Sequence, residues 1–364
     1  MQQIISRAAP LKMGSSEEFA RIGSVLRAAS FDERTICTAF GLSDMSDVAR
    51  VRVADTEQAA ISYQLQILCR LFLVLRLVPR GEVEQAFDQA TISSFLSLGL
   101  LGLGEYGDNF YSKVLLYPVD GFVIASDREI SPDGSPITGM SELVFPAVYE
   151  GTLQFLRLLP KLDGDALDLC AGTGIGAFAL SRGYKRACSL DISQRATEFA
   201  RFNQALNGCE NVQVLQGDLY QPVAGQNFDC IVAHPPYVPS LTLETVWRDG
   251  GVTGDLFVRK IIEGLPQYLR AGGCAMMLTQ GVDTKAGVFE ERARQWLGAA
   301  AGEFDLIFAC KKDRTPEKVL ELLFKKGPDP DAATLSEEFR RAGVVNMPYG
   351  ALFIRRLKRS NQAS

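Results

Sequence analysis

A histidine stands directly after an apolar run that has the composition of a buried strand. The run is Phe228–Ala233, and the tetrapeptide His234-Pro235-Pro236-Tyr237 follows it. His234 is the only histidine among the 364 residues. An imidazole can accept or donate a hydrogen bond, and it can also take a proton near neutral pH. Because prolines restrict the backbone, the tetrapeptide predicts a polar group held in place beside an aromatic ring.

A second pattern, three alternating glycines, lies earlier in the chain. The segment Leu167–Gly176 reads Leu-Asp-Leu-Cys-Ala-Gly-Thr-Gly-Ile-Gly, and a helical stretch, Ala177–Ser181, follows it. Glycines let a chain turn tightly and let backbone N–H groups approach a ligand, while a helix N-terminus favours an anionic group. Several nucleotide cofactors use such a loop. The spacing differs from the Gly-x-Gly-x-x-Gly fingerprint, which disfavours a nicotinamide dehydrogenase.

Aspartates occur where three successive predicted strands approach their ends. Asp168 lies in the strand that enters the glycine loop, Asp191 ends the next strand, and Asp218 follows the third. A carboxylate at the end of the second strand can accept hydrogen bonds from both hydroxyls of a ribose. A pocket that carries acids and no nearby lysine suits a positively charged ligand. Each aspartate alone is compatible with a polar strand end, so the prediction depends on the whole set.

These residues need a scaffold, and from about residue 140 the sequence alternates strands with helices. Apolar runs predict strands at Ala166–Cys170, Arg186–Asp191, Val212–Gly217, Phe228–Ala233, Gly273–Gln280, Phe304–Cys310 and Tyr349–Leu357. This alternation is typical of an α/β fold with a parallel, doubly wound, Rossmann-like sheet. A charged insertion, Arg314–Arg341, is broken by Gly327-Pro328-Asp329-Pro330 and predicts two exposed helices.

The residues ahead of this sheet are predicted to be mainly helical. Ser15–Glu18 has the pattern of a helix start, with hydroxyl residues before two acids. Ala59–Val78 is the longest helix expected, and Pro79 should stop it. Two shorter helices are predicted at Glu82–Ala90 and Ser93–Leu101.

The helical part is predicted to end in a β-hairpin. Phe110–Leu116 and Gly121–Ser126 are short, rich in Val, Tyr and Phe, and separated by turn residues. Helices followed by a hairpin fit a winged-helix-like domain and a plain helical cap equally well. The turn-rich segment Ile130–Pro136 predicts the boundary between an N-terminal domain, 1–135, and a catalytic domain, 136–364.

Composition excludes several classes of protein. The net charge of −5 argues against a dedicated nucleic-acid binder. The eight cysteines are scattered without a Cys-x-x-Cys pair, which predicts reduced thiols in a cytoplasmic protein and no metal site. Met1–Pro10 lacks the apolar run of a signal peptide, and Ile67–Val78 is too short to span a bilayer. We therefore expect no membrane partner.

The strand, the glycine loop and the acids together resemble the class I S-adenosylmethionine-dependent methyltransferases. The resemblance implies S-adenosylmethionine as cofactor, and it implies that the last strand, Tyr349–Leu357, is an antiparallel partner in the sheet. It implies that Asp168 receives the methionine ammonium, that Asp191 binds the ribose and that Asp218 lies near the adenine amino group. The other cofactor-binding positions implied are Cys170, Ala171, Gly172, Thr173, Gly174, Gly176, Ile192 and Leu219.

The tetrapeptide resembles the Asn-Pro-Pro-Tyr motif of methyltransferases that act on nitrogen, among them the release-factor glutamine methyltransferases, with His234 in place of asparagine. The segment Val144–Thr152 is similar to one that closes over the cofactor in that group, which implies roles for Glu150 and Thr152. Similar runs occur at Arg248–Gly254 and Leu269–Gly273, so that the resemblance covers residues 142 to 310.

In the nitrogen methyltransferases that this sequence resembles, the motif orients a planar acceptor nitrogen toward the methyl group, and the aromatic residue stacks on the acceptor. This implies that His234, Pro235 and Tyr237 are catalytic, with His234 also touching the cofactor. The acceptor would be a nitrogen in a small molecule, peptide or protein. Three alternatives stay open: a nucleic-acid N-methyltransferase, an O-methyltransferase with His234 as base, and a non-catalytic cofactor-binding protein. The N-terminal helical domain is a candidate surface for a homodimer.

Overall fold

The computed structural model describes residues 9–137, 140–324 and 330–358. The chain forms two compact units. The first contains Met1–Leu156, Gly172–Ala179 and Ser193–Val214, and the second contains Arg157–Ala171, Leu180–Ile192 and Leu215–Ser364. The prediction that Met1–Pro10 is not a signal peptide falls largely outside the described residues, because residues 1–8 are not among them. Among the described residues, no helix is long and apolar enough to cross a membrane.

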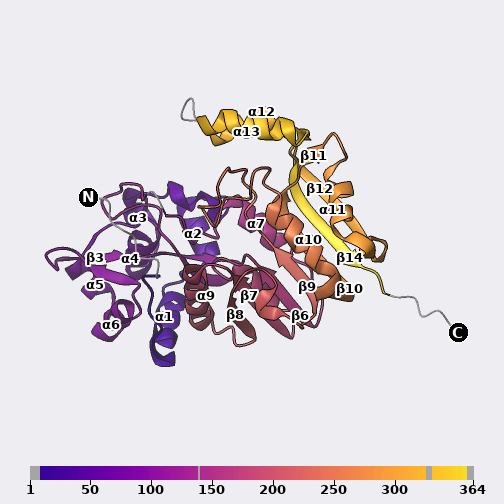
Figure 1. Cartoon of the computed structure of the whole chain (residues 1–364). Helices are drawn as coiled ribbons and strands as arrows, with labels where there is room; N and C mark the ends of the chain where they lie inside the picture. Colours follow the sequence, from indigo (N-terminus) through magenta and orange to yellow (C-terminus); the bar gives the residue numbers. More distant parts are fainter. Residues whose placement is uncertain (1–8, 138–139, 325–329, 359–364) are drawn as a thin grey trace. The chain divides into compact units, whose positions relative to one another are not determined.

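The first unit begins with helices (Figure 1). They are α1 (Ser16–Ala28), α2 (Glu33–Phe40), the 3-10 helix η1 (Met45–Arg50), α3 (Val53–Gln58) and α4 (Tyr63–Phe72). The predicted start at Ser15 is confirmed: its hydroxyl accepts from the Glu18 amide, and the Glu18 carboxylate accepts from the Ser15 amide. The predicted long helix Ala59–Val78 is present only in its middle part, as α4, and both predicted ends are wrong. Ser62 caps a new helix, and the apolar residues after Leu73 leave helical geometry, Leu75 at a φ of 59°.

A winged-helix order of elements follows α4. It comprises β1 (Val78–Pro79), α5 (Arg80–Ala86), α6 (Gln89–Ser97), β2 (Leu101–Leu103) and β3 (Asn109–Ser112). The three strands form a sheet in the order β1-β3-β2, so β2 and β3 make the wing. The predicted bounds of α5 and α6 were too late, because the second helix already begins after Asp88, which caps it. This order of elements favours the winged-helix hypothesis over the plain helical cap.

The predicted hairpin strand Phe110–Leu116 is divided between two strands. Its first part belongs to β3, and its second to β4 (Leu115–Val119), which pairs with β5 (Phe122–Ser126). The β4–β5 turn contains Asp120 and Gly121, at φ values of 49° and 69°. Two positive φ values are the signature of the tight turns that match the twist of a hairpin. A hairpin is therefore present, but it begins later than predicted and is distinct from the wing.

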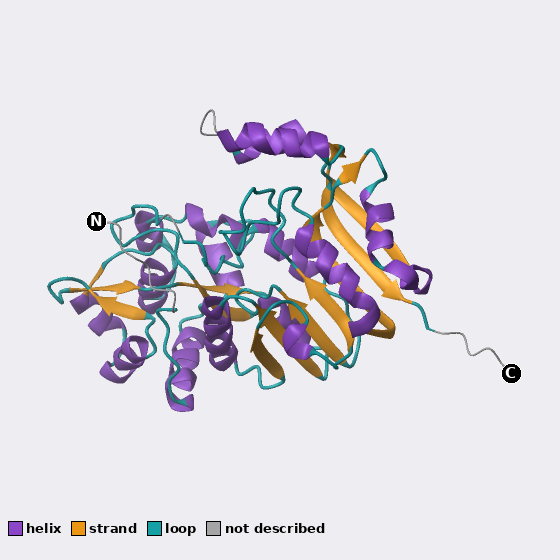
Figure 2. Cartoon of the chain, in the orientation of Figure 1, coloured by secondary structure: helices purple, strands orange, loops and turns teal. Residues whose placement is uncertain are grey.

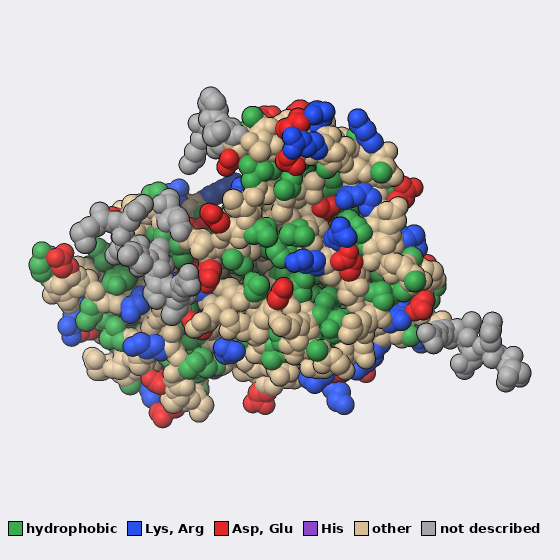
Figure 3. Space-filling model, viewed as in Figure 1, with side chains coloured by type: hydrophobic (Ala, Val, Ile, Leu, Met, Phe, Trp, Pro, Cys, Tyr) green, Lys and Arg blue, Asp and Glu red, His purple; other side chains and the backbone are tan. Residues whose placement is uncertain are grey.

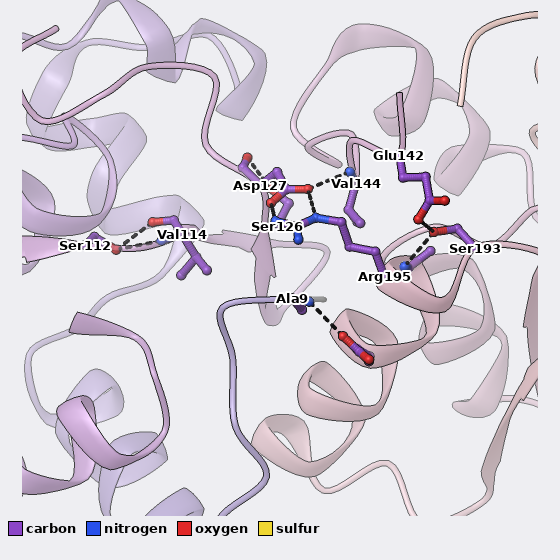
Figure 4. Close-up of polar contacts among 11 residues, drawn as sticks. Ala9, Ser112, Val114, Ser126, Asp127, Glu142, Val144, Ser193 and Arg195 are labelled. Atoms are coloured by element: carbon purple, nitrogen blue, oxygen red, sulfur yellow. Dashed lines mark hydrogen bonds and ion pairs between the residues drawn. The ribbon is translucent and has the colours of Figure 1, made fainter. Parts of the chain in front are cut away.

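A buried ion pair lies in the first unit (Figure 4). Asp127 follows β5, and Arg195 is on α9 (Gln194–Asn207); their side chains are only 4% and 5% exposed. Arg195 Nε donates to Asp127 Oδ2 at 2.8 Å, and the Val144 amide donates to the same oxygen at 2.8 Å. Asn203 on α9 also pairs with the backbone of Ala125, donating at 3.0 Å and accepting at 2.8 Å. Polar contacts thus hold α9 against β5.

The main sheet has seven strands in the order β12-β14-β10-β9-β6-β7-β8. They are β6 (Asp165–Leu169), β7 (Arg186–Asp191), β8 (Val212–Gln216), β9 (Phe228–Ala233), β10 (Leu269–Gln280), β12 (Phe304–Lys312) and β14 (Tyr349–Arg356). β6 pairs in parallel with β7 and β9, and β10 pairs in parallel with β9. β14 runs antiparallel to both β10 and β12, as predicted for the last strand. The predicted α/β architecture is confirmed.

Helices α10 (Leu256–Tyr268) and α11 (Phe289–Trp296) complete the main core of the second unit (Figure 1). Apolar residues of both helices are buried with those of β6, β7, β9, β10 and β14. Parallel strands covered in this way lose nearly all contact with water, which explains their continuous apolar runs. The remaining elements outside the insertion are α7 (Glu150–Arg157), α8 (Ile175–Ser181), η2 (Gln221–Val223) and η3 (Gly298–Glu303).

The charged insertion forms two helices, α12 (Pro316–Leu323) and α13 (Pro330–Arg341), which lie beyond the end of the sheet (Figure 2). The two predicted helices are present, but the prediction that they are exposed holds only for part of each helix. Val319, Leu335 and Phe339 are buried in a small second core with Val282 and Met347. The small sheet of β11 (Asp283–Thr284) and β13 (Val344–Asn346) adjoins them. Residues Gly327, Pro328 and Asp329 of the predicted break lie outside the described residues.

Candidate active site

Three predicted carboxylates act electrostatically on one thiol at the carboxyl end of the second unit's parallel strands. Cys170 follows β6, and burial raises the pKa of its thiol well above the ordinary value. The charges of Asp191, Asp168 and Asp218 raise that pKa further, so all three lie close to Cys170. Asp168 is 2% exposed, whereas Asp218 is at the surface. Negative charge is therefore concentrated at the carboxyl ends of the strands, which is where α/β sheets of this kind bind their ligands.

Backbone contacts keep these strand ends together. The Ala171 amide donates to the Leu190 carbonyl at 3.1 Å, and the Gly217 amide donates to the Asp191 carbonyl at 2.9 Å. Two non-glycine residues here have left-handed backbones, Cys170 at a φ of 56° and Leu219 at 45°. Such conformations are costly and concentrate at functional sites. Ile192, next to Asp191, leaves 52% of its surface exposed, which provides an apolar surface beside the acid.

The other predicted cofactor-binding residues belong to the first unit. Gly172 and Gly174 have φ values of 54° and 84°, which favour glycine. A Cβ on Gly174 would also lie 2.7 Å from the Phe178 ring. The Thr173 carbonyl accepts from Asn203 at 3.1 Å, and Gly176 lies in the first turn of α8.

The two remaining predicted residues of that unit lie at the start of a helix. Glu150 begins α7 and is exposed, and Thr152 follows in the same turn and is partly buried. Their roles over the cofactor, and those of the glycines, stay predictions.

His234 leaves β9 and stacks on Tyr237. The ring centroids are 5.9 Å apart, and the planes differ by 22°. The residue as a whole is partly buried, and its Nε2 atom is fully buried. Burial lowers the pKa of His234 from 6.5 to about 4. The imidazole is therefore neutral at pH 7, which favours hydrogen bonding to an acceptor and weakens the hypothesis that His234 is a general base near neutral pH.

The loop after the tetrapeptide holds it in place. The Val238 amide donates to the Arg248 carbonyl at 3.0 Å, and the Gly250 amide donates to the Val238 carbonyl at 2.8 Å. A Cβ on Gly250 would lie 2.7 Å from the Cα of Tyr237, and one on Gly254 would lie 2.4 Å from its carbonyl oxygen. The glycines of the predicted run Arg248–Gly254 thus allow one backbone segment to approach another.

Three residues near Tyr237 were not predicted as site residues. The Tyr349 ring at the start of β14 lies 5.5 Å from the Tyr237 ring. Burial raises the pKa of Tyr237, while a hydrogen bond from Tyr349 and the positive charge of Arg314 lower it. Gln280, at the end of β10, lies directly opposite Tyr349. These residues come from distant parts of the chain, and no spacing in the sequence connects them.

Similarity to known proteins identifies the family of the chain. The model of the methyltransferase small domain family matches residues 146–290. The chain is 32% identical over 153 residues to a Methanocaldococcus jannaschii protein named "Putative protein N5-glutamine methyltransferase", and the match covers 39% of this chain and 77% of that protein. The chain therefore belongs to the methyltransferase small domain family of S-adenosylmethionine-dependent enzymes.

Two further relatives are matched over a shorter share of their length. A release factor glutamine methyltransferase of Thermodesulfovibrio yellowstonii is 33% identical over 139 residues, which cover 35% of this chain and 50% of that protein. A ribosomal protein uL3 glutamine methyltransferase of Bradyrhizobium diazoefficiens is 30% identical over 161 residues, with 40% and 50% covered. The chain spans about half the length of these two relatives.

Proposed function

We propose that the protein transfers a methyl group from S-adenosylmethionine to the side-chain amide nitrogen of a glutamine in a protein or peptide. The observation that carries the proposal is the neutral imidazole of His234, with its Nε2 atom buried, stacked on Tyr237 at the end of β9. The names of the relatives, which include release factor and ribosomal protein glutamine methyltransferases, support an amide acceptor.

The residues at the strand ends fit the cofactor. S-adenosylmethionine, when bound, supplies an electrophilic methyl group on a positively charged sulfur. The acids around Cys170 favour a cation, because opposite charges attract most strongly where water is scarce. In this proposal Asp168 binds the ammonium, Asp191 the ribose hydroxyls and Asp218 the adenine amino group. Exposed Ile192 and the strained Cys170 and Leu219 backbones border the same place.

His234 and the turn after it orient the acceptor. A planar amide lies against Tyr237, where stacking excludes water from one face. One ring nitrogen of the neutral His234 accepts a hydrogen bond from the amide N–H, as a glutamine or asparagine oxygen would. This contact aims the nitrogen at the methyl group, and alignment of this kind supplies much of the catalysis in a transfer reaction. A neutral imidazole serves this purpose better than a cation, which has no acceptor atom.

A labelling experiment tests the proposal. Purified protein is incubated with methyl-labelled S-adenosylmethionine and a cell extract, and the protein, nucleic-acid and small-molecule fractions are separated. We expect label in protein, recovered as N5-methylglutamine after digestion. His234→Ala should remove at least 90% of the label, whereas His234→Asn, which keeps an acceptor atom, should retain most of it. Label in nucleic acid, or on a hydroxyl, would replace the proposal with one of its alternatives, and cofactor binding without label would indicate a binding protein.

A further inference from the structure

The end of β10 places Gln280 beside the aromatic rings of the candidate acceptor site. Gln280 is the register partner of Tyr349 in the antiparallel β10–β14 pair. Side chains of directly opposed residues in such a pair lie on the same face of the sheet. On that face the Tyr349 ring lies 5.5 Å from Tyr237, whose ring stacks on His234. Gln280 therefore belongs to the surroundings of the proposed acceptor rather than to the remote core.

Gln280 carries a buried donor. The residue is 4% exposed, and its Nε2 atom has no hydrogen-bond partner among the described residues. Buried polar groups in folded proteins are nearly always paired, and exceptions need a functional explanation. A ligand that accepts a hydrogen bond would satisfy this amide.

Arg314 brings a positive charge to the same place. It follows β12, and its carbonyl accepts from the Met347 amide at 2.8 Å, which ties it to the chain just before Tyr349. Its side chain is partly buried and makes no ion pair within the described part of the chain. Burial raises the pKa of Tyr237, and the positive charge of Arg314 opposes that rise, which indicates that the guanidinium lies close to Tyr237.

Asp313, the neighbour of Arg314 in the chain, and Asp283 both accept hydrogen bonds from other groups. Asn346 Nδ2 donates to Asp313 and, at 3.3 Å, to Asp283. Asp283 also accepts from the Phe289 amide at 2.7 Å. The Asp283 carboxylate is therefore already bonded to the Asn346 side chain and to the first residue of α11. The Arg314 guanidinium beside Tyr237 remains available to an anion from outside the protein.

We propose that Arg314 and Gln280 form an anion-binding subsite beside Tyr237 and Tyr349 that binds a carboxylate carried by the methyl acceptor. The inference rests on the proposed function, because it adds a feature to the proposed acceptor: the methylated amide has a carboxylate group within a few bonds. Such a carboxylate comes either from an acidic residue next to the methylated one or from a free α-carboxyl group. A guanidinium with an amide donor is well suited to both oxygens of a carboxylate.

Matched probes test the subsite by binding, with S-adenosylhomocysteine present so that no transfer is needed. N-acetylglutamine is compared with its methylamide, which lacks the carboxylate. The peptide acetyl-Gln-Asp-amide is compared with acetyl-Gln-Asn-amide. Isothermal titration should show at least about ten-fold tighter binding of the carboxylate member of one pair. The pair that discriminates identifies the source of the carboxylate.

Three variants test whether the preference for a carboxylate depends on Arg314 and Gln280 rather than on the overall charge of the protein. Arg314→Gln and Gln280→Met should reduce the discrimination to less than about two-fold while leaving S-adenosylhomocysteine affinity unchanged. Arg259→Gln removes an exposed arginine of α10 that pairs with Glu263 at 2.7 Å, and it should keep the discrimination. Equal binding of charged and neutral probes up to tens of millimolar, or discrimination that Arg314→Gln retains, would overturn the subsite. Carboxylate-dependent binding without label transfer would instead overturn the proposed function alone.

Discussion

The His234 ring lies 5.9 Å from the Tyr237 ring, and the two planes differ by only 22°. The stacking leaves the imidazole in a poorly solvated place, where its charged form is disfavoured. The charge state of His234 is therefore a measurable property of the site, and because it is the only histidine in the chain, its titration can be observed without overlap.

We expect a histidine-selective NMR titration to give a pKa near 4, compared with 6.5 for an unperturbed imidazole. The folded pKa is the lower of the two, so the unfolded state binds the proton first as the pH falls. The free energy of unfolding should then decrease from pH 6.5 downward, with the loss complete below about pH 4. Between pH 7.5 and 5.5 this single group should cost about 1.4 kcal/mol.

His234→Asn is the control for that prediction, because asparagine does not titrate. Urea unfolding at pH 7.5, 6.5 and 5.5 should show the decrease in the unmodified protein and a flatter profile in the variant. A titration midpoint at or above 6.5 would contradict the neutral imidazole, and with it the role in which His234 only orients the acceptor.

Gly254 should be required for acceptor turnover. In Gly254→Ala the backbone at a φ of 89° is strained, and the new Cβ would lie 2.4 Å from the Tyr237 carbonyl oxygen. The strain costs about 1–2 kcal/mol, and the clash displaces the turn that carries Tyr237. We expect kcat/KM for the acceptor to fall at least ten-fold while S-adenosylmethionine affinity stays within two-fold.

Gly225→Ala is the matched control for Gly254. Its φ of 79° imposes the same kind of backbone strain, but a Cβ there would meet nothing within 4 Å. It should keep normal kcat/KM. If both variants lose activity equally, the close approach to Tyr237 is not the cause.

Asp191 should contribute to cofactor affinity through its charge. Asp191→Asn keeps the shape of the side chain, and the Gly217 amide can still donate to its backbone carbonyl, 2.9 Å away. Hydrogen bonds to a charged group contribute about 1.5–3 kcal/mol, so the dissociation constant for S-adenosylmethionine should rise about 10- to 100-fold. Asp305→Asn, at an exposed position of β12, should leave it unchanged in the same calorimetric titration. Equal affinities for both variants would remove Asp191 from the cofactor site.

The sheet was predictable because its strands are buried on both faces. Most residues inside Arg186–Asp191 and Phe228–Ala233 are apolar and buried, and both strands occur with the predicted bounds. Their polar ends marked Asp191 and His234 as candidates before any contact was known. In the N-terminal part the same reasoning found the helix within Ala59–Val78 but not its ends, since the apolar residues after Phe72 are compatible with a helix, a coil or a strand.

The acceptor side of the site was only partly predictable. His234 and Tyr237 are adjacent in the chain, so their motif is visible in the sequence. Gln280, Arg314 and Tyr349 come from β10, from the start of the insertion and from β14, and only the antiparallel pairing of β14 brings them together. The insertion also carries paired charges, such as Lys318 with Glu321 at 2.8 Å, so its charge composition gave no indication of a site. On the visible face, blue and red side chains alternate over that region (Figure 3).

The ion pair of Asp127 and Arg195 should be the most sensitive polar contact for stability. Both side chains are about 95% buried, and Asp127 also holds the Val144 amide. Asp127→Ala leaves a buried guanidinium without its carboxylate, which typically costs about 3–5 kcal/mol. Replacing both partners, as Asp127→Leu with Arg195→Met, removes the uncompensated charge and should recover part of that loss. Glu263→Gln, which breaks the exposed pair with Arg259, should cost under about 1 kcal/mol. Urea unfolding at pH 7.5 measures all three. A loss for Asp127→Ala no larger than that for Glu263→Gln would show that the buried pair contributes no more than a surface one.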